Sequence, residues 1–275
     1  MKKLLAIAIL FGALTISAQD KKEEPKEGWK KGGNISFLFN QSAFNNWLAG
    51  GTNNISGTLG LNYDFNYTKG DWTWDNKIIA SYGVTKLKGQ GAQKTDDRFE
   101  LNSLAGKRAS EYWYYSAFFN FKTQMSSTDV SGTQLSHFFS PAYFQFGPGM
   151  LWKKSDNLKI NIAPATSKLV VLSEDLAPAF GVEAGESTRY ELGASVSGYY
   201  KFDIMENVSV ENILNLYSNY LEDFQNVDLD YTVNIVMKIN KYLSANLALQ
   251  TIYDDNAFKG FQTREVFGLG INYGF

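Results

Sequence analysis

The chain has 275 residues, with 26 basic and 28 acidic side chains, 15% aromatic residues and no cysteine. The nearly balanced charge argues against a nucleic-acid-binding surface, which needs a basic excess. The lack of cysteine excludes disulfides, thiolate metal sites and lipid attachment to cysteine. Abundant aromatic residues with a mean hydropathy of only −0.26 are typical of strands that alternate apolar and polar side chains.

The first 18 residues predict a secretory signal peptide. Lys2 and Lys3 precede an apolar run from Leu4 to Ile16, and we expect cleavage after Ala18. Gln19 to Lys31 is charged and lacks periodicity, so we expect a mobile lead-in in the periplasm. No later stretch has the roughly 18 unbroken apolar residues of a spanning helix. A mature chain in a membrane must therefore cross it as a closed barrel.

From Gly32 to Phe275, alternating segments predict one domain: an all-β, transmembrane, antiparallel up-and-down barrel of about twelve strands. The clearest segment runs from Asn54 to Tyr67, with Leu59 and Leu61 on its apolar face. In the ninth segment, Ile213 and Leu214 interrupt the alternation, and a β-bulge would explain this. The expected strands centre on residues 35–39, 54–67, 72–84, 99–101, 113–121, 142–146, 158–162, 190–200, 208–214, 231–239, 247–253 and 265–275.

The last segment, Arg264 to Phe275, alternates most strictly and ends the chain on an aromatic ring. We interpret Phe267, Tyr273 and Phe275 as the terminal-strand signal of an outer-membrane barrel. The expected partners are therefore the outer-membrane lipid and the machinery that inserts barrels into it.

The expected connections differ in length at the two ends of the strands. Short turns at residues 69–71, 109–111, 153–157, 205–207 and 240–242 alternate with longer segments at 86–97, 126–139, 172–187, 222–226 and 254–261. Transmembrane barrels have short periplasmic turns and longer extracellular loops. The alternation therefore predicts that both termini lie on the periplasmic side.

Two glycine-containing stretches near the start carry a resemblance to a known family. Trp29-Lys30-Lys31-Gly32-Gly33, then Ser36, precede Gln41-Ser42-Ala43-Phe44-Asn45-Asn46-Trp47-Leu48-Ala49-Gly50-Gly51. This pattern, W-K-x-G-G followed by Q-S-x-F-x-N-W-x-x-G-G, resembles the opening of a family of Gram-negative outer-membrane β-barrels of unknown function. The resemblance implies a barrel in the outer membrane and no particular activity. From the residues themselves, Gln41, Asn46, Trp47, Gly50 and Gly51 form either a turn that fixes the first hairpin or a binding or gating element.

The alternation also predicts which charged residues point into the lumen. Acids and bases are nearly balanced there, so they either pair across the lumen or line opposite walls of a weakly selective channel. The lumen-facing candidates are Asp64, Asp75, Lys77, Glu100, Arg108, Lys122, Lys159, Glu191, Lys201, Glu211 and Lys238, with Asp230 and Arg264 on the same criterion.

We expect no cofactor, no metal and no enzymatic activity. The single His137 lies in a long loop beside Ser136, and no G-x-S-x-G motif occurs. Asp254, Asp255 and Asn256, or Asp228 with Asp230, offer oxygen ligands for Ca²⁺, but they lack an ordered loop pattern, so we interpret them as a solvated acidic rim.

The predicted function is an outer-membrane barrel that forms a narrow channel or binding barrel for small polar solutes. The alternative is a closed barrel that serves as an accessory subunit for other envelope proteins. Gln19 to Lys31 and the loop Leu172 to Ser187 would then be its contact surfaces.

Overall fold

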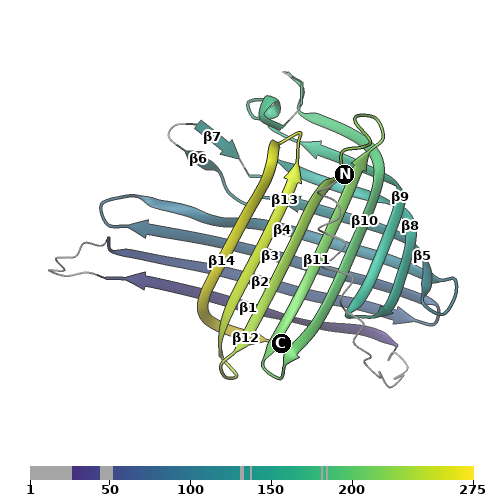
Figure 1. The fold of residues 1–275 in the computed structure, drawn as a ribbon, viewed down its shortest axis with the longest axis horizontal. Coiled ribbons are helices and arrows are strands. Elements are labelled where there is room, and N and C mark those ends of the chain that lie inside the picture. The colour runs from purple at the N-terminus through teal and green to yellow at the C-terminus, as the bar shows by residue number, and fades with distance from the viewer. Residues whose placement is uncertain (1–26, 44–51, 131–132, 137, 181, 184) are drawn as a thin grey trace.

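The main body of the protein is a closed barrel of twelve antiparallel strands (Figure 1). The structure, a computed structural model, describes residues 27–43, 52–130, 133–136, 138–180, 182–183 and 185–275. Around the ring the order is β1-β14-β13-β12-β11-β10-β9-β8-β5-β4-β3-β2, and β6 and β7 form a separate hairpin. The strands are β1 (Gly28–Ser42), β2 (Asn54–Lys69), β3 (Trp72–Leu87), β4 (Ala92–Arg108), β5 (Trp113–Thr123), β6 (Thr128–Val130), β7 (Thr133–Ser136), β8 (Ala142–Ser155), β9 (Leu158–Val171), β10 (Thr188–Met205), β11 (Val208–Asn219), β12 (Asp228–Lys238), β13 (Leu243–Asp254) and β14 (Phe258–Gly274).

The twelve-strand barrel predicted from the sequence is confirmed, but its first boundary shifts. β1 begins at Gly28, so residues 28–31, which we assigned to the lead-in, belong to the barrel wall. The expected signal peptide and residues 19–26 lie outside the described residues.

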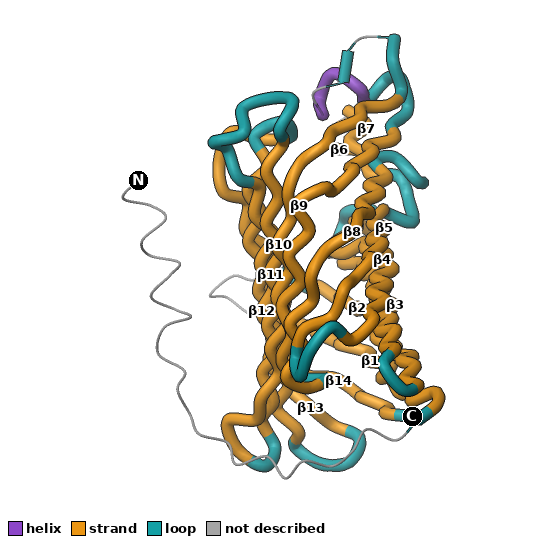
Figure 2. Tube along the Cα trace, turned by 90° about the vertical axis from the view of Figure 1, so that its right-hand side faces the viewer, coloured by secondary structure: helices purple, strands orange, loops and turns teal. Residues whose placement is uncertain are grey.

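The two ends of the barrel differ, and we call them the short-turn end and the long-loop end. The carboxyl terminus lies at the short-turn end (Figure 2). The long-loop end carries the β6–β7 hairpin and the 3-10 helix η1 (Ala177–Phe180). The predicted strict alternation of short and long connections is wrong at two places. β3 and β4 continue until only residues 88–91 join them, and residues 255–257 join β13 to β14.

The ninth predicted strand, β11, is regular rather than bulged. Val208 to Tyr217 pair with β12 residue by residue without a shift. Ile213 borders the internal cavity. An apolar side chain thus stands at a lumen-facing position, and this is why the alternation breaks there. The expected bulge at Ile213 and Leu214 is absent from this described strand.

The ring closes where β1 meets β14. Asn34 to Phe39 pair with Gly274 to Leu269, and β14 continues from Gly268 to Phe258 with β13 as its partner. The apolar row of β14 runs from Tyr273 back to Phe267, and the next residue on that face is Glu265. This row therefore covers nearly the same part of β14 as the pairing with β1. The two strands are therefore paired where lipid would otherwise meet unsatisfied backbone groups.

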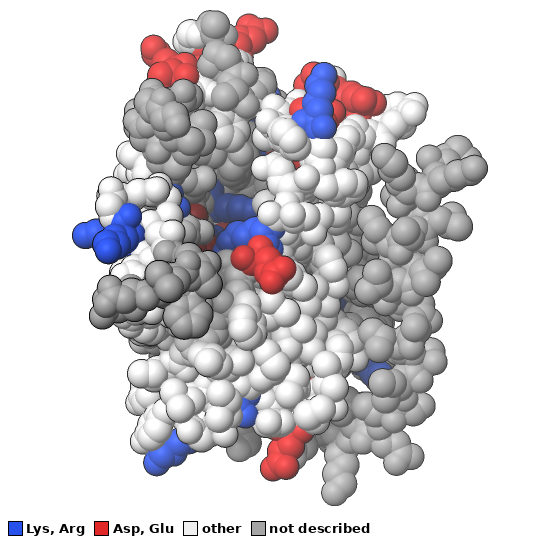
Figure 3. All heavy atoms as spheres, turned by 60° about the vertical axis from the view of Figure 1, so that its left-hand side comes forward, with Lys and Arg blue, Asp and Glu red and all other residues white. Residues whose placement is uncertain are grey.

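The outer surface of the wall is apolar. Phe267, Leu269, Ile271 and Tyr273 each expose more than half of their surface. In Figure 3, charged side chains gather near the two ends and in a hollow, while uncharged residues cover much of the wall between them. Soluble monomers rarely expose so large an apolar surface, whereas transmembrane barrels present such a band to lipid. This is the architecture of a transmembrane barrel.

Aromatic rings form a belt on the outside at the short-turn end. Trp29 lies 5.1 Å from the Tyr67 ring and 5.8 Å from the Trp74 ring. Trp72, at the start of β3, and Trp113, at the start of β5, are also exposed at this end. Such belts sit at the level of lipid headgroups. The described residues contain no helix long and apolar enough to cross a membrane.

The interior is mostly polar, with one small apolar cluster at the long-loop end. Leu172, Leu176, Ala177 and Val182, from the β9–β10 connection, are buried against Val170 of β9. Tyr143 and Phe180 pack on this cluster. These apolar residues of the connection are therefore packed against the wall at the long-loop end.

Candidate functional site

A cavity of about 1160 Å³ occupies the lumen. At the short-turn end it is bordered by Asn240 and Lys241, and at the long-loop end by Asp254 and Ala257. Between these ends its wall carries asparagine, serine, lysine and aspartate side chains from most strands. The lumen is therefore a polar space that reaches both ends of the barrel.

Ion pairs cross this space between opposite walls. Lys77 on β3 and Glu211 on β11 lie six positions apart in the ring of twelve, yet Lys77 Nζ and Glu211 Oε1 are 2.9 Å apart. The Tyr199 hydroxyl donates to Glu211 Oε1 at 2.9 Å, and Asn234 Nδ2 donates to Oε2 at 2.9 Å. Asp64 adds a second carboxylate 3.5 Å from Lys77. We call these five residues the central knot.

A second crossing lies toward the long-loop end. Lys122 Nζ on β5 is 2.7 Å from Asp230 Oδ2 on β12, and Gln250 Nε2 donates to Asp230 Oδ1 at 2.8 Å. Glu100 lies 3.7 Å from Lys122 and accepts two hydrogen bonds from Arg98, each 2.8 Å long. These charges are partly or fully buried, so each needs its partner to offset the cost of leaving water.

A third crossing lies near the short-turn end. The buried Asp75 carboxylate on β3 accepts hydrogen bonds from Lys153 Nζ of β8 at 2.8 Å and from Lys159 Nζ of β9 at 2.7 Å. Lys153 also contacts Asp156 in the β8–β9 turn at 3.1 Å. Partial burial alone would raise the pKa of Asp156, but the positive charges of Lys153 and Lys30 outweigh it and hold this pKa below its ordinary value.

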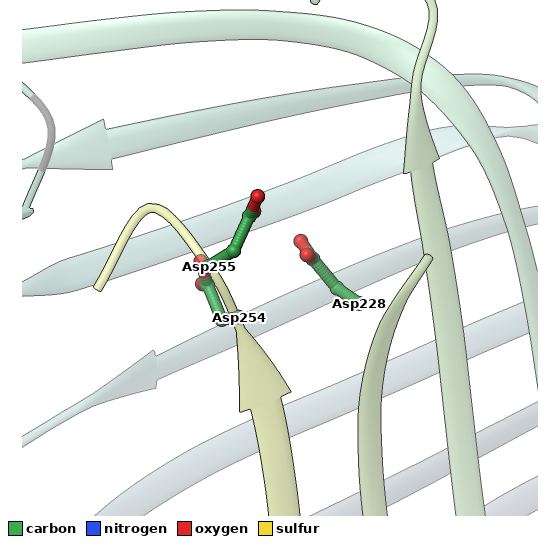
Figure 4. A group of neighbouring side chains, drawn as sticks. All are labelled: Asp228, Asp254 and Asp255. Atoms are coloured by element: carbon green, nitrogen blue, oxygen red, sulfur yellow. The ribbon is translucent and has the colours of Figure 1, made fainter. Parts of the chain in front are cut away.

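Three carboxylates converge at the long-loop end (Figure 4). One oxygen each from Asp228, Asp254 and Asp255 lies within 4.8 Å of the others. The Lys168 ammonium is 3.1 Å from Asp228, 3.3 Å from Glu191 and 3.9 Å from Asp254. It also lies 4.8 Å from the centre of the Tyr217 ring. A lysine side chain thus supplies positive charge to this acidic cluster.

The structure places the predicted lumen residues in three ways. Eight of the eleven candidates border the cavity: Asp64, Asp75, Lys77, Glu100, Lys122, Lys159, Lys201 and Lys238. Glu191 and Glu211 lie beside Lys168 and Lys77. Arg108 does not border the cavity; it lies 3.8 Å from Asp71 and 5.3 Å from the Tyr114 ring at the short-turn end.

The other predicted residues are spread out. Asp230 borders the cavity, whereas Arg264 lines a smaller hollow of about 320 Å³ and pairs with Asp96 at 2.5 Å. Phe267, Tyr273 and Phe275 are exposed on or after β14. Gln41 lies in β1 opposite Ile55, and Asn46, Trp47, Gly50, Gly51 and His137 lie outside the described residues.

Lys168 is a cavity residue that the alternation pattern does not predict. In β9 the inward positions Lys159 and Asn161 are odd-numbered, whereas Lys168 is even-numbered and also borders the cavity. The pairing with β10 shifts between Ala163 and Thr166, which reverses the alternation. Pro164 in this interval was the only signal in the sequence.

Comparisons with known proteins add a family match over part of the chain. Residues 39–128 match the model of a protein family of unknown function, DUF3078. No curated protein matches the sequence.

Several solved structures are similar in fold. The translocator domain of the autotransporter NalP from Neisseria meningitidis is 9% identical with a TM-score of 0.37, covering 100% of this chain and 98% of that chain. The COG4313 outer membrane channel from Pseudomonas putida F1 is 10% identical with a TM-score of 0.40, covering 94% and 98%. The outer membrane phospholipase OMPLA from Salmonella typhi is 12% identical with a TM-score of 0.38, covering 91% and 94%. All three TM-scores are below 0.5, so these similarities do not extend to function.

Proposed function

We propose that this protein is an outer-membrane barrel whose lumen admits and binds small polar solutes. Lipid-facing aromatic and aliphatic side chains and a short-turn end that holds the carboxyl terminus support this location. The short-turn end would face the periplasm and the long-loop end the outside.

The observation that carries the proposal is the cavity of about 1160 Å³, bordered by residues at both ends of the barrel. A barrel built only as a scaffold can fill its interior with side chains, as small barrels do. Here the interior is hollow, and charged, amide and hydroxyl side chains stand among the residues that border it. Its walls offer hydrogen-bond donors, acceptors and both signs of charge, which suit a hydrated solute rather than a lipid tail.

The central knot sets the width of the passage. Because Lys77 and Glu211 come from opposite walls, a solute must pass beside their ion pair or separate it. We therefore expect a narrow channel of low conductance, or a barrel that binds solute and releases it slowly.

Planar-bilayer recording on the purified protein tests this. The Lys77→Ala/Glu211→Ala variant removes both side chains of the crossing, so its single-channel conductance should exceed that of the wild type. Lys154→Ala/Glu206→Ala changes one base and one acid away from the cavity lining and should behave as wild type. If neither the wild type nor the knot variant conducts, and neither swells liposomes in small sugars, the proposed passage is refuted.

A closed barrel that serves other envelope proteins is the second candidate, and the crossings of the lumen favour it. Against it, Leu172, Leu176, Ala177 and Val182 of the β9–β10 connection are buried instead of being presented to a partner. Crosslinking in intact membranes distinguishes the two: recovery of the barrel alone counts against an accessory role.

A further inference from the structure

We propose that the short-turn half of the lumen is a binding vestibule for anionic solutes that carry carboxylate or phosphate groups. This inference deepens the proposed function, because it names the class of solute that the lumen would take. It rests on how the charges that border the cavity are distributed along the barrel axis.

The two halves of the cavity carry opposite excess charge. In the short-turn half, six lysines and three aspartates border it; in the long-loop half, two lysines face four carboxylates. The short-turn set is Lys30, Lys77, Lys159, Lys201, Lys238 and Lys241 with Asp64, Asp75 and Asp156, and the long-loop set is Lys122 and Lys168 with Glu100, Asp228, Asp230 and Asp254. Lys31 also borders the cavity, but it pairs with Phe65 on the outward face of the wall. Lys241 lies in the β12–β13 turn at the rim, with its ammonium 4.7 Å from the Tyr242 ring.

Every acid that borders the cavity has a basic partner within 4 Å. Among the described residues, Lys201, Lys238 and Lys241 have no carboxylate within that distance, and all three lie toward the short-turn end. Asp203 is two residues from Lys201 on the same strand, but it does not border the cavity. The lysines without a carboxylate partner are therefore confined to the short-turn end, whereas at the long-loop end Asp228 and Asp254 share the single ammonium of Lys168.

Deeper in the same half, two lysines already hold carboxylates. Lys77 binds Glu211 and Asp64, and Lys159 binds Asp75. Both ammonium groups lie within 5.5 Å of the centre of the Tyr199 ring, so these two cations face the same part of the lumen. The carboxylates of Glu211 and Asp75 thus occupy positions in which an anionic solute could replace them.

The free lysines at the mouth and the paired lysines below them form a path for an anion. Lysine suits such a path, since its ammonium is a point charge on a flexible stem and binds carboxylate and phosphate without fixed geometry. A lumen wall of low dielectric also focuses the field of these charges. An anion entering at the short-turn end would meet Lys238 and Lys241 first, then Lys201, then the central knot.

Inorganic pyrophosphate is a suitable probe, and its binding to the purified full-length barrel in detergent can be measured by calorimetry at low salt. The wild type should bind it, and binding should weaken as salt rises. The Lys201→Gln/Lys238→Gln/Lys241→Gln variant should lose about tenfold or more in affinity, because three positive charges leave the mouth. Lys69→Gln/Lys107→Gln/Lys154→Gln removes the same net charge from short-turn-end positions outside the cavity lining and should bind as wild type.

Reversal potentials in a salt gradient give a second readout. Wild-type channels should prefer chloride over potassium, and the Lys201/Lys238/Lys241 variant should lose that preference. A conducting wild type that prefers potassium and does not bind pyrophosphate would overturn the anionic vestibule while leaving the proposed passage intact. A barrel that does not conduct but binds pyrophosphate through these lysines would support the vestibule and refute passage. Equal loss of binding in both triple variants would also overturn it, since net charge alone would then be responsible.

Discussion

Gly33 of β1 and Phe275, the residue after β14, join the first and last strands by a pair of backbone hydrogen bonds. The Gly33 N–H donates to the Phe275 carbonyl at 2.9 Å, and the Phe275 N–H donates to the Gly33 carbonyl at 3.0 Å. The last residue of the chain thus completes the seam between β1 and β14. A side chain at Gly33 would meet the Asn62 carbonyl oxygen at 2.5 Å and the Phe275 ring at 3.2 Å.

Gly33→Ala should therefore weaken closure of the barrel. A Cβ at 2.5 Å from a backbone oxygen forces the wall to shift, and we expect a loss of about 1–3 kcal/mol in the free energy of unfolding. Gly32→Ala is the matched control, because a Cβ there approaches nothing closer than the Phe275 carbonyl at 3.5 Å. Urea unfolding in lipid vesicles measures both, and equal stability of the two variants would contradict this account.

The central knot predicts strong coupling between Lys77 and Glu211. Lys77→Met leaves Glu211 with a buried charge and no cation, at a cost of about 3–5 kcal/mol, and Glu211→Met should be similar. The double variant removes both charges and should lose less than the two single variants together. A double-mutant cycle on unfolding free energies measures this coupling, and additive losses would show that the pair does not interact.

The lipid-facing row of β14 predicts that the cost of a charged substitution depends on its depth in the bilayer. Ile271 faces outward in the paired part of the strand, so Ile271→Arg should destabilise the barrel by about 2–4 kcal/mol. Phe261 lies beyond Glu265 toward the long-loop end, where arginine should cost about 0–1 kcal/mol. Folding into vesicles measures both. Equal costs at the two positions would mean that lipid does not surround this face.

Lys168 predicts how the barrel responds to calcium. In the wild type its ammonium lies against Asp228, Glu191 and Asp254, so millimolar CaCl₂ should leave the thermal midpoint unchanged. Lys168→Ala removes this cation from carboxylates already within 4.8 Å of one another. We expect this variant to be less stable in EDTA and to regain stability in CaCl₂, with a dissociation constant on the order of 10⁻³ M.

Lys168→Ala/Asp255→Asn removes one ligand from that cluster and is the control, since its response to CaCl₂ should be smaller. Stabilisation of the wild type and of both variants to the same extent would place the calcium effect elsewhere.

The sequence by itself determined the strand number, the lipid-facing positions and most of the inward charges. Alternation with period two needs no distant contact, because successive side chains of a strand point to opposite faces whatever the strand pairs with. For this reason the row from Phe267 to Phe275 was assigned correctly to one face. The same local logic failed in β9, where the shift near Pro164 turned Lys168 inward. It also made two loops too long, because β4 begins at Ala92 and β14 at Phe258, before the expected loop ends at residues 97 and 261.

Only the tertiary structure decided what the inward charges do. Lys77 and Glu211 are 134 residues apart and sit on facing walls, and no local pattern sets the distance between walls. That distance follows from strand tilt and from the closure of β1 on β14, which are properties of the whole ring. The sequence supplied balanced charges, and the closed barrel determined that they meet across the lumen. Within the described part of the chain it leaves Lys201, Lys238 and Lys241 without a carboxylate partner at the short-turn end.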